Sequence, residues 1–140
     1  MTHDEIAQLD AAQLRLEVAK AKGYIDNRQF CENEFLGPDN EWYYLESEYS
    51  SDRILPNWPA DIAAAMGLIV EMRDAGYLVI VKAWPVENWQ FSSPALKEFL
   101  RGRVSVEVMS KQADNEVYFH GGGTTIEEAA CRAYLMLKQG

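Results

Sequence analysis

Two stretches of this 140-residue sequence carry side chains whose types and spacing could do chemistry. The first is an acidic and aromatic run between Arg28 and Arg53, with no lysine or arginine inside it. Carboxylates spaced along a surface can imitate the phosphates of a nucleic acid, and aromatic side chains anchor many protein interfaces. The run therefore predicts a surface that binds a basic groove of another protein, formed by Glu32, Glu34, Asp39, Glu41, Trp42, Tyr44, Glu46, Glu48 and Tyr49. The alternative is a solvated acidic face whose aromatic side chains pack onto the domain.

The second stretch is a glycine-rich connection between a predicted strand and the last predicted helix. A flexible backbone with unpaired N–H groups and two hydroxyls could hold a phosphate or another anion there. Nearby indoles could stack on a base, so the stretch predicts a nucleotide site formed by Trp84, Trp89, His120, Gly121, Gly122, Gly123, Thr124 and Thr125. It has neither the lysine of a Walker A loop nor the GxGxxG spacing. A tight connection with an ordinary helix cap is the alternative.

Other residue patterns give no sign of catalysis. His3 and His120 are the only histidines and have no metal-ligand spacing. Cys31 and Cys131 lie far apart in the sequence, which predicts two free thiols. Glutamates two positions apart, as at 32 and 34, are common on solvated strands, and the HGGG string has no GxSxG nucleophile elbow beside it. The sequence predicts a binding protein that is not an enzyme, with no cofactor and no metal.

Composition narrows the class of partner. The chain has 22 acidic and 13 basic side chains, a formal net charge of −9. Such a charge repels polyanions and so disfavours direct binding to nucleic acid or to an anionic membrane. No apolar run approaches a membrane span, and the first residues lack a signal-peptide pattern, so a cytoplasmic protein is expected. The length suits one domain over residues 1–140.

Helix signals occur in three places. Asp10 and Gln13 form a capping box for a helix over residues 10–22, which Gly23 ends. Pro59 suits the first turn of a second helix, which Gly76 ends. The helical spacing of Ile62, Met66, Ile69, Val70 and Arg73 supports this helix, which is expected to be largely buried. Thr125 and Glu128 begin a closing helix with the apolar stripe Ile126, Ala130, Ala133 and Leu137.

Strand signals follow the second helix. Residues 77–84, 104–109 and 116–120 predict three antiparallel strands, with a turn at 112–115. Residues 85–102 form a long connection with a helical turn at 95–100. The fold class is therefore α+β, a three-stranded antiparallel sheet packed with helices in the order α-α-β-β-β-α. An irregular acidic aromatic insertion over residues 24–58, with one strand at 42–49, follows the first helix.

Three sequence blocks lie in or directly after the predicted helices: Leu16-Glu17-Val18-Ala19 with Gly23-Tyr24, Asp61-Ile62-Ala63-Ala64-Ala65, and Ala129-Ala130-Cys131-Arg132-Ala133. In order and spacing these blocks resemble the phage ABA sandwich domain family. The resemblance covers most of the chain, and its blocks are mainly helical packing positions. It implies an α/β sandwich encoded by a phage or prophage, with no established catalytic residues to carry over.

Two functions are expected from these observations. The first is a non-enzymatic phage accessory protein that binds and modulates a host protein with a basic surface, such as an anti-defence inhibitor, through the acidic aromatic run. The second is a binding module or sponge for a nucleotide signal at the glycine-rich stretch. Self-association through an exposed sheet edge or aromatic patch stays open, although acidic self-repulsion opposes it.

Overall fold

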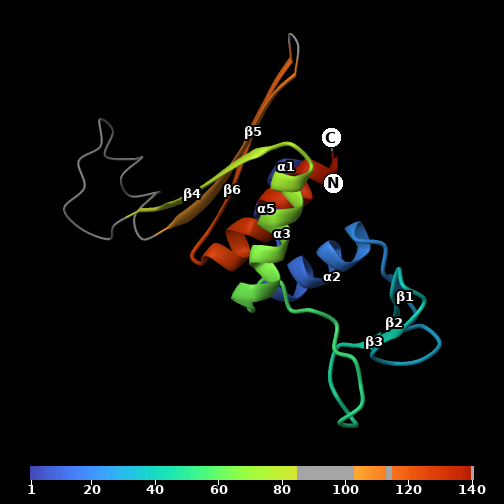
Figure 1. The fold of residues 1–140 in the computed structure, drawn as a ribbon. Helices are drawn as coiled ribbons and strands as arrows, with labels where there is room; N and C mark the ends of the chain where they lie inside the picture. Colours follow the sequence, from blue (N-terminus) through green and yellow to red (C-terminus); the bar gives the residue numbers. More distant parts are fainter. Residues whose placement is uncertain (85–102, 113–114, 140) are drawn as a thin grey trace.

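The computed structural model describes residues 1–84, 103–112 and 115–139 (Figure 1). Within these residues the chain forms four helices and two three-stranded antiparallel sheets, sheet A (β1-β2-β3) and sheet B (β4-β5-β6). The helices are α1 (His3–Ala7), α2 (Ala11–Ala21), α3 (Ile62–Asp74) and α5 (Ile126–Gln139). The strands are β1 (Ile25–Asp26), β2 (Glu34–Leu36), β3 (Trp42–Tyr44), β4 (Leu78–Ala83), β5 (Val104–Gln112) and β6 (Asn115–Gly123).

The α+β class is confirmed, but the expectation of one sheet is wrong. The described elements run α-α-β-β-β-α-β-β-β-α. The residues expected to form an irregular insertion build sheet A, and the strand predicted at 42–49 ends at Tyr44. Strands of two or three residues are too short to show the alternation by which a strand is recognised. Helix α1 is also separate from α2, with its own capping box at Thr2 and Glu5.

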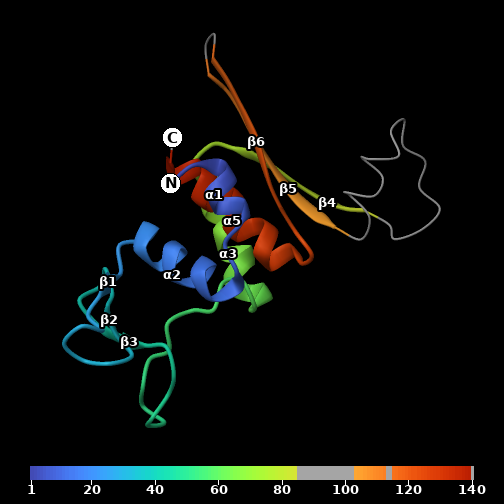
Figure 2. The same cartoon turned by 180° about the vertical axis from the view of Figure 1, so that it is seen from behind.

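Sheet B presents one face to the helices and leaves the other open. Strand β5 is central and pairs with β4 and β6, with Val106 opposite Val81 and Gly121. Val106 and Val108 point to the helical side and are fully buried. On the opposite face Leu78 and Tyr118 are exposed, and the helices lie together on one side of the sheet (Figures 1 and 2).

Helix α5 is the centre of the core. It packs against β5, β6 and the three other described helices. Its small residues Ala129 and Ala133 let β6 approach closely. A Cβ atom on Gly121 would lie 2.3 Å from the Ala133 nitrogen and 2.5 Å from the Ala129 carbonyl oxygen, which is an impossible contact. The predicted end of the third strand at His120 is wrong: β6 continues to Gly123, and Gly121 and Gly123 allow it to lie close to α5.

Several predicted helix boundaries are confirmed. Asp10 accepts from the Gln13 N–H at 2.8 Å and caps α2, and Gly23 follows that helix with φ +95°. Gly76 follows α3 with φ +101°. Thr125 Oγ1 accepts from the Glu128 N–H at 3.2 Å at the start of α5. Local hydrogen-bonding chemistry therefore decides where these helices begin and end.

The expectation that α3 is largely buried is wrong. The buried residues are Ala65, Leu68 and Met72, whereas Ile62, Met66 and Val70 are exposed. The helix is apolar around most of its circumference, so spacing alone does not select the face that packs. Its N-cap is Asp61, whose carboxylate accepts from the Ala63 N–H at 2.9 Å, and Pro59 lies before the helix rather than in its first turn.

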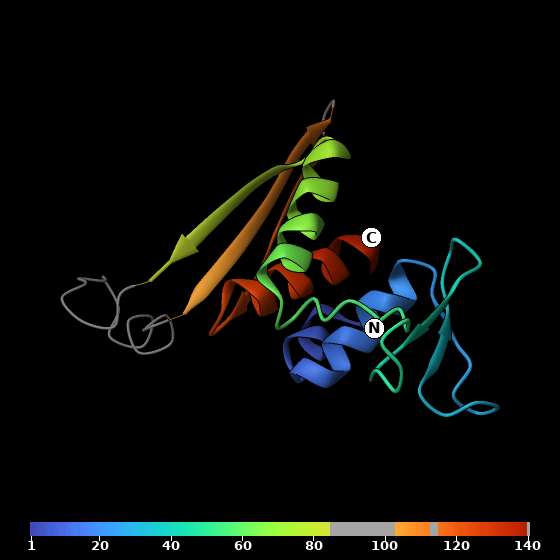
Figure 3. The same cartoon turned by 60° about the horizontal axis from the view of Figure 1, so that its bottom comes forward.

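Sheet A lies on the far side of the helices from sheet B (Figure 3). Its inner face contributes Phe35 to the core, next to the buried residues Leu55 and Trp58. Arg15 of α2 donates to the carbonyl oxygens of Leu45 (3.4 Å), Pro56 (3.3 Å) and Leu55. The Arg15 side chain therefore ties α2 to the segment that follows sheet A.

Some sequence predictions concern residues outside the described ranges. These are Trp89, the connection over residues 85–102 with its helical turn at 95–100, and residues 113–114 of the turn after β5. The strands on either side of that turn pair from Gln112 opposite Asn115 to Val104 opposite Gly123.

Candidate functional site

The outer face of sheet A carries an apolar row. The register aligns Ile25 with Leu36 and Leu36 with Trp42, so these three side chains lie across neighbouring strands on one face. Ile25 is 61% exposed and Trp42 is 44% exposed. Tyr44 lies on the same face as Trp42, two residues along β3, opposite Glu34. Apolar side chains aligned and exposed in this way are available for contact with another molecule.

Carboxylates lie in the chain segments next to the Glu34–Tyr44 pair of sheet A. Glu32, Glu46 and Glu48 line a hollow of about 450 Å³, together with Arg28. The Arg28 guanidinium is held by Asp26, with Nη2 2.6 Å from Oδ2. The three glutamates therefore leave this hollow with a net negative charge.

Hydrogen bonds fix the backbone that presents these glutamates. Asn33, at φ 75°, donates from Nδ2 to the Glu46 carbonyl at 2.7 Å and accepts from the Glu46 N–H at 2.9 Å. The Asp52 carboxylate accepts from the N–H groups of Glu48 and Tyr49, both at 2.9 Å. Tyr49 remains largely exposed. The carboxylates of Glu46 and Glu48 thus stand on an ordered turn.

Tyr44 lies close to this acidic group. Its pKa is raised by burial and by the charges of Glu34 and Asp52, with a further contribution from Glu48. Glu34 accepts from Asn27 Nδ2 at 3.1 Å. We define the sheet A surface as the apolar row with this acidic rim: Ile25, Leu36, Trp42, Tyr44, Glu32, Glu34, Glu46 and Glu48.

The other predicted acids form a separate group. Asp39 accepts from the Tyr43 hydroxyl at 2.7 Å, and this hydrogen bond holds the pKa of Asp39 below its ordinary value. Arg53 approaches Asp39 at 3.8 Å and Glu41 at 4.0 Å. Asp39 and Glu41 are therefore partly neutralised by the arginine that follows the acidic run.

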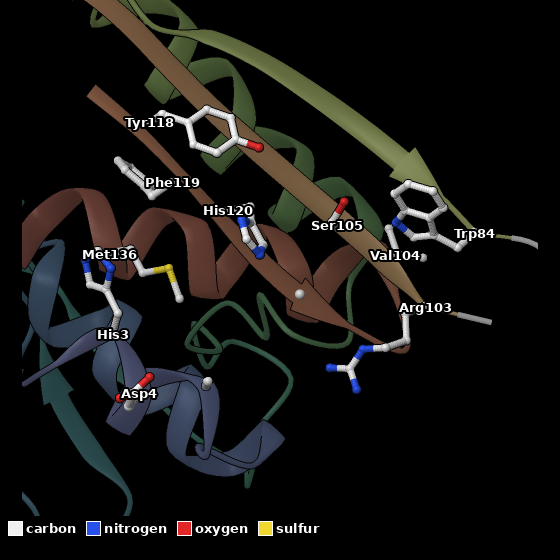
Figure 4. Close-up of a pocket in the computed structure, with 12 residues that line it drawn as sticks. His3, Asp4, Trp84, Arg103, Val104, Ser105, Tyr118, Phe119, His120 and Met136 are labelled. Carbon is white, nitrogen blue, oxygen red and sulfur yellow. The ribbon is translucent and has the colours of Figure 1, made fainter. Parts of the chain in front are cut away.

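A second candidate place is a pocket of about 530 Å³ between β6 and α1 (Figure 4). His3 and Asp4 line it on the helix side. The sheet side combines aromatic, cationic and small residues, among them Trp84, Arg103, Ser105, Tyr118, His120 and Gly122. This combination of an indole and a phenol with a guanidinium and an imidazole suits an anionic aromatic molecule.

The structure brings together only part of the predicted nucleotide site. Trp84, His120 and Gly122 line the pocket. Gly121 and Gly123 face α5, because Cβ atoms there would contact Ala133 and Arg132. Thr124 and Thr125 are exposed, Thr125 caps α5, and Trp89 lies outside the described residues.

The backbone around the glycines is also engaged. Arg132 donates from Nη1 to the Gly122 carbonyl at 2.7 Å and from Nη2 to the Leu9 carbonyl at 2.8 Å. This contact ties the edge of β6 to the segment between α1 and α2. Together with the cap on α5, it gives the glycine stretch a packing role.

Several residues of the sheet A surface and of the pocket beside β6 were not predicted from the sequence. Ile25 and Leu36 join Trp42 only through strand register, which the sequence pattern did not reveal. Arg103, Ser105 and Tyr118 line the pocket because β5 and β6 pair side by side. The predicted strands at 104–109 and 116–120 held the signal for these last residues, since their pairing places Ser105 and Tyr118 on one face.

The cysteine side chains are free thiols in different settings. Cys31 is exposed and Cys131 is buried in α5. A hydrogen bond with Glu34 raises the pKa of Cys31, and burial raises the pKa of Cys131 to about 12. Neither setting favours a thiolate nucleophile.

Within the described ranges, no three His, Cys, Asp or Glu side chains are grouped so as to hold a metal ion. A search of the same residues found no helix with the length and apolar character that crossing a membrane requires. Comparisons with protein-family models, with curated proteins and with solved structures found no match. The resemblance to the phage ABA sandwich family stays a prediction.

Proposed function

We propose that this protein binds another protein through the sheet A surface. The observation that carries the proposal is the row Ile25–Leu36–Trp42 on one face of sheet A, in which Ile25 and Trp42 are exposed, with carboxylates in the segments next to the neighbouring Glu34–Tyr44 pair. A row of large apolar side chains on a short sheet is a compact anchor. The partner has a cleft that takes the indole and basic side chains that meet the rim.

The two parts of the surface have different tasks in this proposal. Burial of Trp42 and Ile25 supplies affinity, because aromatic anchors dominate the energetics of many interfaces. The rim at Glu32, Glu46 and Glu48 attracts a partner with lysines and arginines and excludes acidic ones. Since Arg28 is already paired with Asp26, it does not cancel this charge.

A narrower form of the proposal concerns the partner's identity. The resemblance to a phage family, together with the charge, favours a bacterial host protein that handles nucleic acid or takes part in defence. Carboxylates in place of phosphates would occupy the groove that normally receives the polyanion, and the protein would act as an inhibitor. The partner's own activity, measured with and without this protein, tests that form.

The experiment is capture of partners on immobilised protein from a bacterial lysate, followed by calorimetry with the purified partner. Trp42→Ser removes the anchor, and Glu48→Lys reverses one rim charge. Asp74→Lys makes the same change of charge on α3, where Asp74 is exposed and contacts Arg73. We expect the first two variants to lose the partner and Asp74→Lys to keep it.

Salt provides a second criterion. The affinity should fall as salt rises, because charges at the rim are screened. A partner that binds Trp42→Ser and Glu48→Lys as tightly as the unchanged protein would overturn the assignment of the sheet A surface.

The pocket beside β6 supports a second candidate, the binding of a nucleotide or another anionic aromatic molecule. The observation that favours it is the meeting of Trp84, Arg103 and His120 at one hollow of a protein with net charge −9. Gly122→Val fills the hollow, since a Cβ atom there meets only the Arg103 guanidinium, at 3.8 Å. A nucleotide that raises the melting temperature of the unchanged protein should not stabilise this variant. Absence of a shift across a nucleotide panel would contradict this candidate.

A further inference from the structure

The outer edge of sheet B at β4 has features of a pairing site. Strand β4 is the end strand of its sheet, and no segment among residues 1–84, 103–112 and 115–139 pairs with its outer side. Its sequence is Leu-Val-Ile-Val-Lys-Ala, and each of these residues is exposed or half-buried. Natural sheet edges are usually protected by proline, a bulge or several charges. Here the register with β5 runs without a bulge, there is no proline, and Lys82 is the single charge.

The β6 edge of sheet B differs from the β4 edge. At β6, Arg132 occupies the outward carbonyl of Gly122 at 2.7 Å, and α1 lies alongside, with His3 near the Phe119 ring. Among the described residues, a side chain engages an outward backbone group of β6, whereas no strand pairs with the outer edge of β4.

The pairing with β5 determines which backbone groups of β4 point outward. The Trp84 N–H donates to the Arg103 carbonyl at 2.8 Å, so this residue pair is hydrogen-bonded. Hydrogen-bonded pairs alternate along antiparallel strands. Lys82, Ile80 and Leu78 therefore bond to β5, whereas the N–H and C=O groups of Val79, Val81 and Ala83 face the open edge.

Apolar side chains stand next to this edge. Val81 is 42% exposed although it points to the helical side of the sheet. On α3, the exposed residues Ile62, Met66 and Val70 form a stripe on the flank away from Glu71, which faces α2 through Lys22. Figure 3 shows α3 diverging from β4 below their junction.

We propose that a second copy of this chain pairs with β4, forming a two-fold dimer with a continuous six-stranded sheet. A strand that pairs antiparallel with itself must present the same groups from both copies, as a two-fold interface requires. Val81 at the axis lies opposite Val81 of the other copy, and Val79 lies opposite Ala83. The outward N–H and C=O groups of all three residues are then paired, and the two valine rows meet beside the α3 stripes.

The charge distribution permits this contact. Sheet A, which carries most of the acidic run, lies across the helices from β4 (Figures 1 and 3). The mutual repulsion of two chains of charge −9 therefore acts over a long distance and is screened by salt. Dimer formation should strengthen with added salt, the opposite of what is expected for a basic partner on sheet A.

The test is sedimentation equilibrium of the full chain over a concentration series at low and high salt. We expect a monomer–dimer equilibrium that Val81→Pro abolishes, because proline removes the outward N–H at the axis while the bonds to β5 remain. Val81→Lys places two like charges at the axis and should also give a monomer. Val81→Thr, which keeps the backbone and shape, should remain dimeric. Circular dichroism and melting curves establish that each variant is folded.

Defined results would overturn the proposal. They are a monomer at every concentration and salt tested, or a dimer that persists in both Val81→Pro and Val81→Lys. A dimer lost in Trp42→Ser but kept in Val81→Pro would place the interface on sheet A instead. The partner assay measures the effect of substituting Trp42, and the dimer assay measures the effect of substituting Val81. Failure of one proposal therefore leaves the other intact.

Discussion

The two sheets have the same number of strands but are stabilised in different ways. Strands of six to nine residues build sheet B, and its valines pack directly on α5. Sheet A has strands of two or three residues, and its position depends on Phe35, on neighbouring Trp58 and on the carbonyl contacts of Arg15. Sheet B is thus part of the core, whereas sheet A is attached to it. An attached sheet can keep an apolar outer face without weakening the core.

The strongest test of this difference is at the glycines of β6. Gly121→Val should destabilise the protein by about 3 kcal/mol or more, because the new side chain would overlap the backbone of α5. Gly122→Ala is the matched control, since its Cβ reaches only the Arg103 side chain at 3.8 Å. Urea unfolding measures both. Equal stability of the two variants would show that the close approach of β6 to α5 is not required.

A smaller and local effect is expected at the attachment of sheet A. Arg15→Leu removes the donor to three carbonyl groups and should cost about 2 kcal/mol. Amide hydrogen exchange should rise over residues 25–44 and change little in sheet B. Arg53→Leu is the control, because its contacts with Asp39 and Glu41 are long and exposed, worth roughly 0.5 kcal/mol. Faster exchange in both sheets would mean that the sheets unfold as one unit.

Acid should weaken the contacts that join α3 to α2 and α5. Glu71 of α3 lies 2.7 Å from Lys22, just after α2, and accepts from the Tyr134 hydroxyl of α5 at 3.0 Å. Burial raises the pKa of Glu71, but the hydrogen bonds and charge of Lys22, together with Tyr134, outweigh it, so the pKa falls below its ordinary value of 4.5. A lowered carboxyl pKa contributes stability above the unfolded value and loses it as pH falls through the folded value.

Glu71→Gln measures this contribution. Urea unfolding of both proteins should differ at neutral pH, and the difference should shrink as pH falls below 4.5. A difference that stays constant down to the acid limit would show that the ion pair is not responsible. Glu41→Gln, which changes an exposed acid of the sheet A region, serves as the control.

The smallest change in stability is expected on the outer face of sheet A. Trp42→Ser should alter the free energy of unfolding by no more than about 0.5 kcal/mol, because the indole is exposed and is not part of the buried core. The same substitution should abolish partner binding. A large loss of stability would show that Trp42 has a packing role.

The features that the sequence predicted well depend on interactions between residues that are close in the chain. Asp10, Gly23, Gly76 and Thr125 act through bonds within a few residues, and their helix boundaries follow from side-chain and backbone chemistry alone. The three strands of sheet B were also found, because long alternating runs with β-branched residues are distinctive. The exact ends of these strands were not predicted.

What the sequence did not show depends on contacts between distant residues. The strands of sheet A are too short to show a pattern of their own, and the segment that follows them is bound to α2 through Arg15. Glycine at position 121 was interpreted as a loop residue, but its role is a close approach to Ala133. The exposed stripe of α3 was predicted to be buried because an apolar helix can pack on more than one side.

The candidate sites also combine features that were visible in the sequence with features that depend on contacts between distant residues. The acidic and aromatic composition of residues 32–52 was plain in the sequence. Its separation into an outward rim and a pair of acids beside Arg53 depends on the turn held by Asn33 and Asp52. The pocket at β6 needed the pairing of β5 with β6 to bring Arg103 and Ser105 beside His120.

The two cysteine thiols differ in their accessibility to a chemical reagent, and this difference can be used to follow opening of the core. Cys31 is exposed beside sheet A, whereas Cys131 lies in the middle of α5 with no accessible surface. A thiol-specific reagent should modify Cys31 first and reach Cys131 only when α5 separates from the sheet. At reagent concentrations high enough that modification outpaces reclosing, the rate at Cys131 gives the opening rate of the core, in native buffer and without any engineered label.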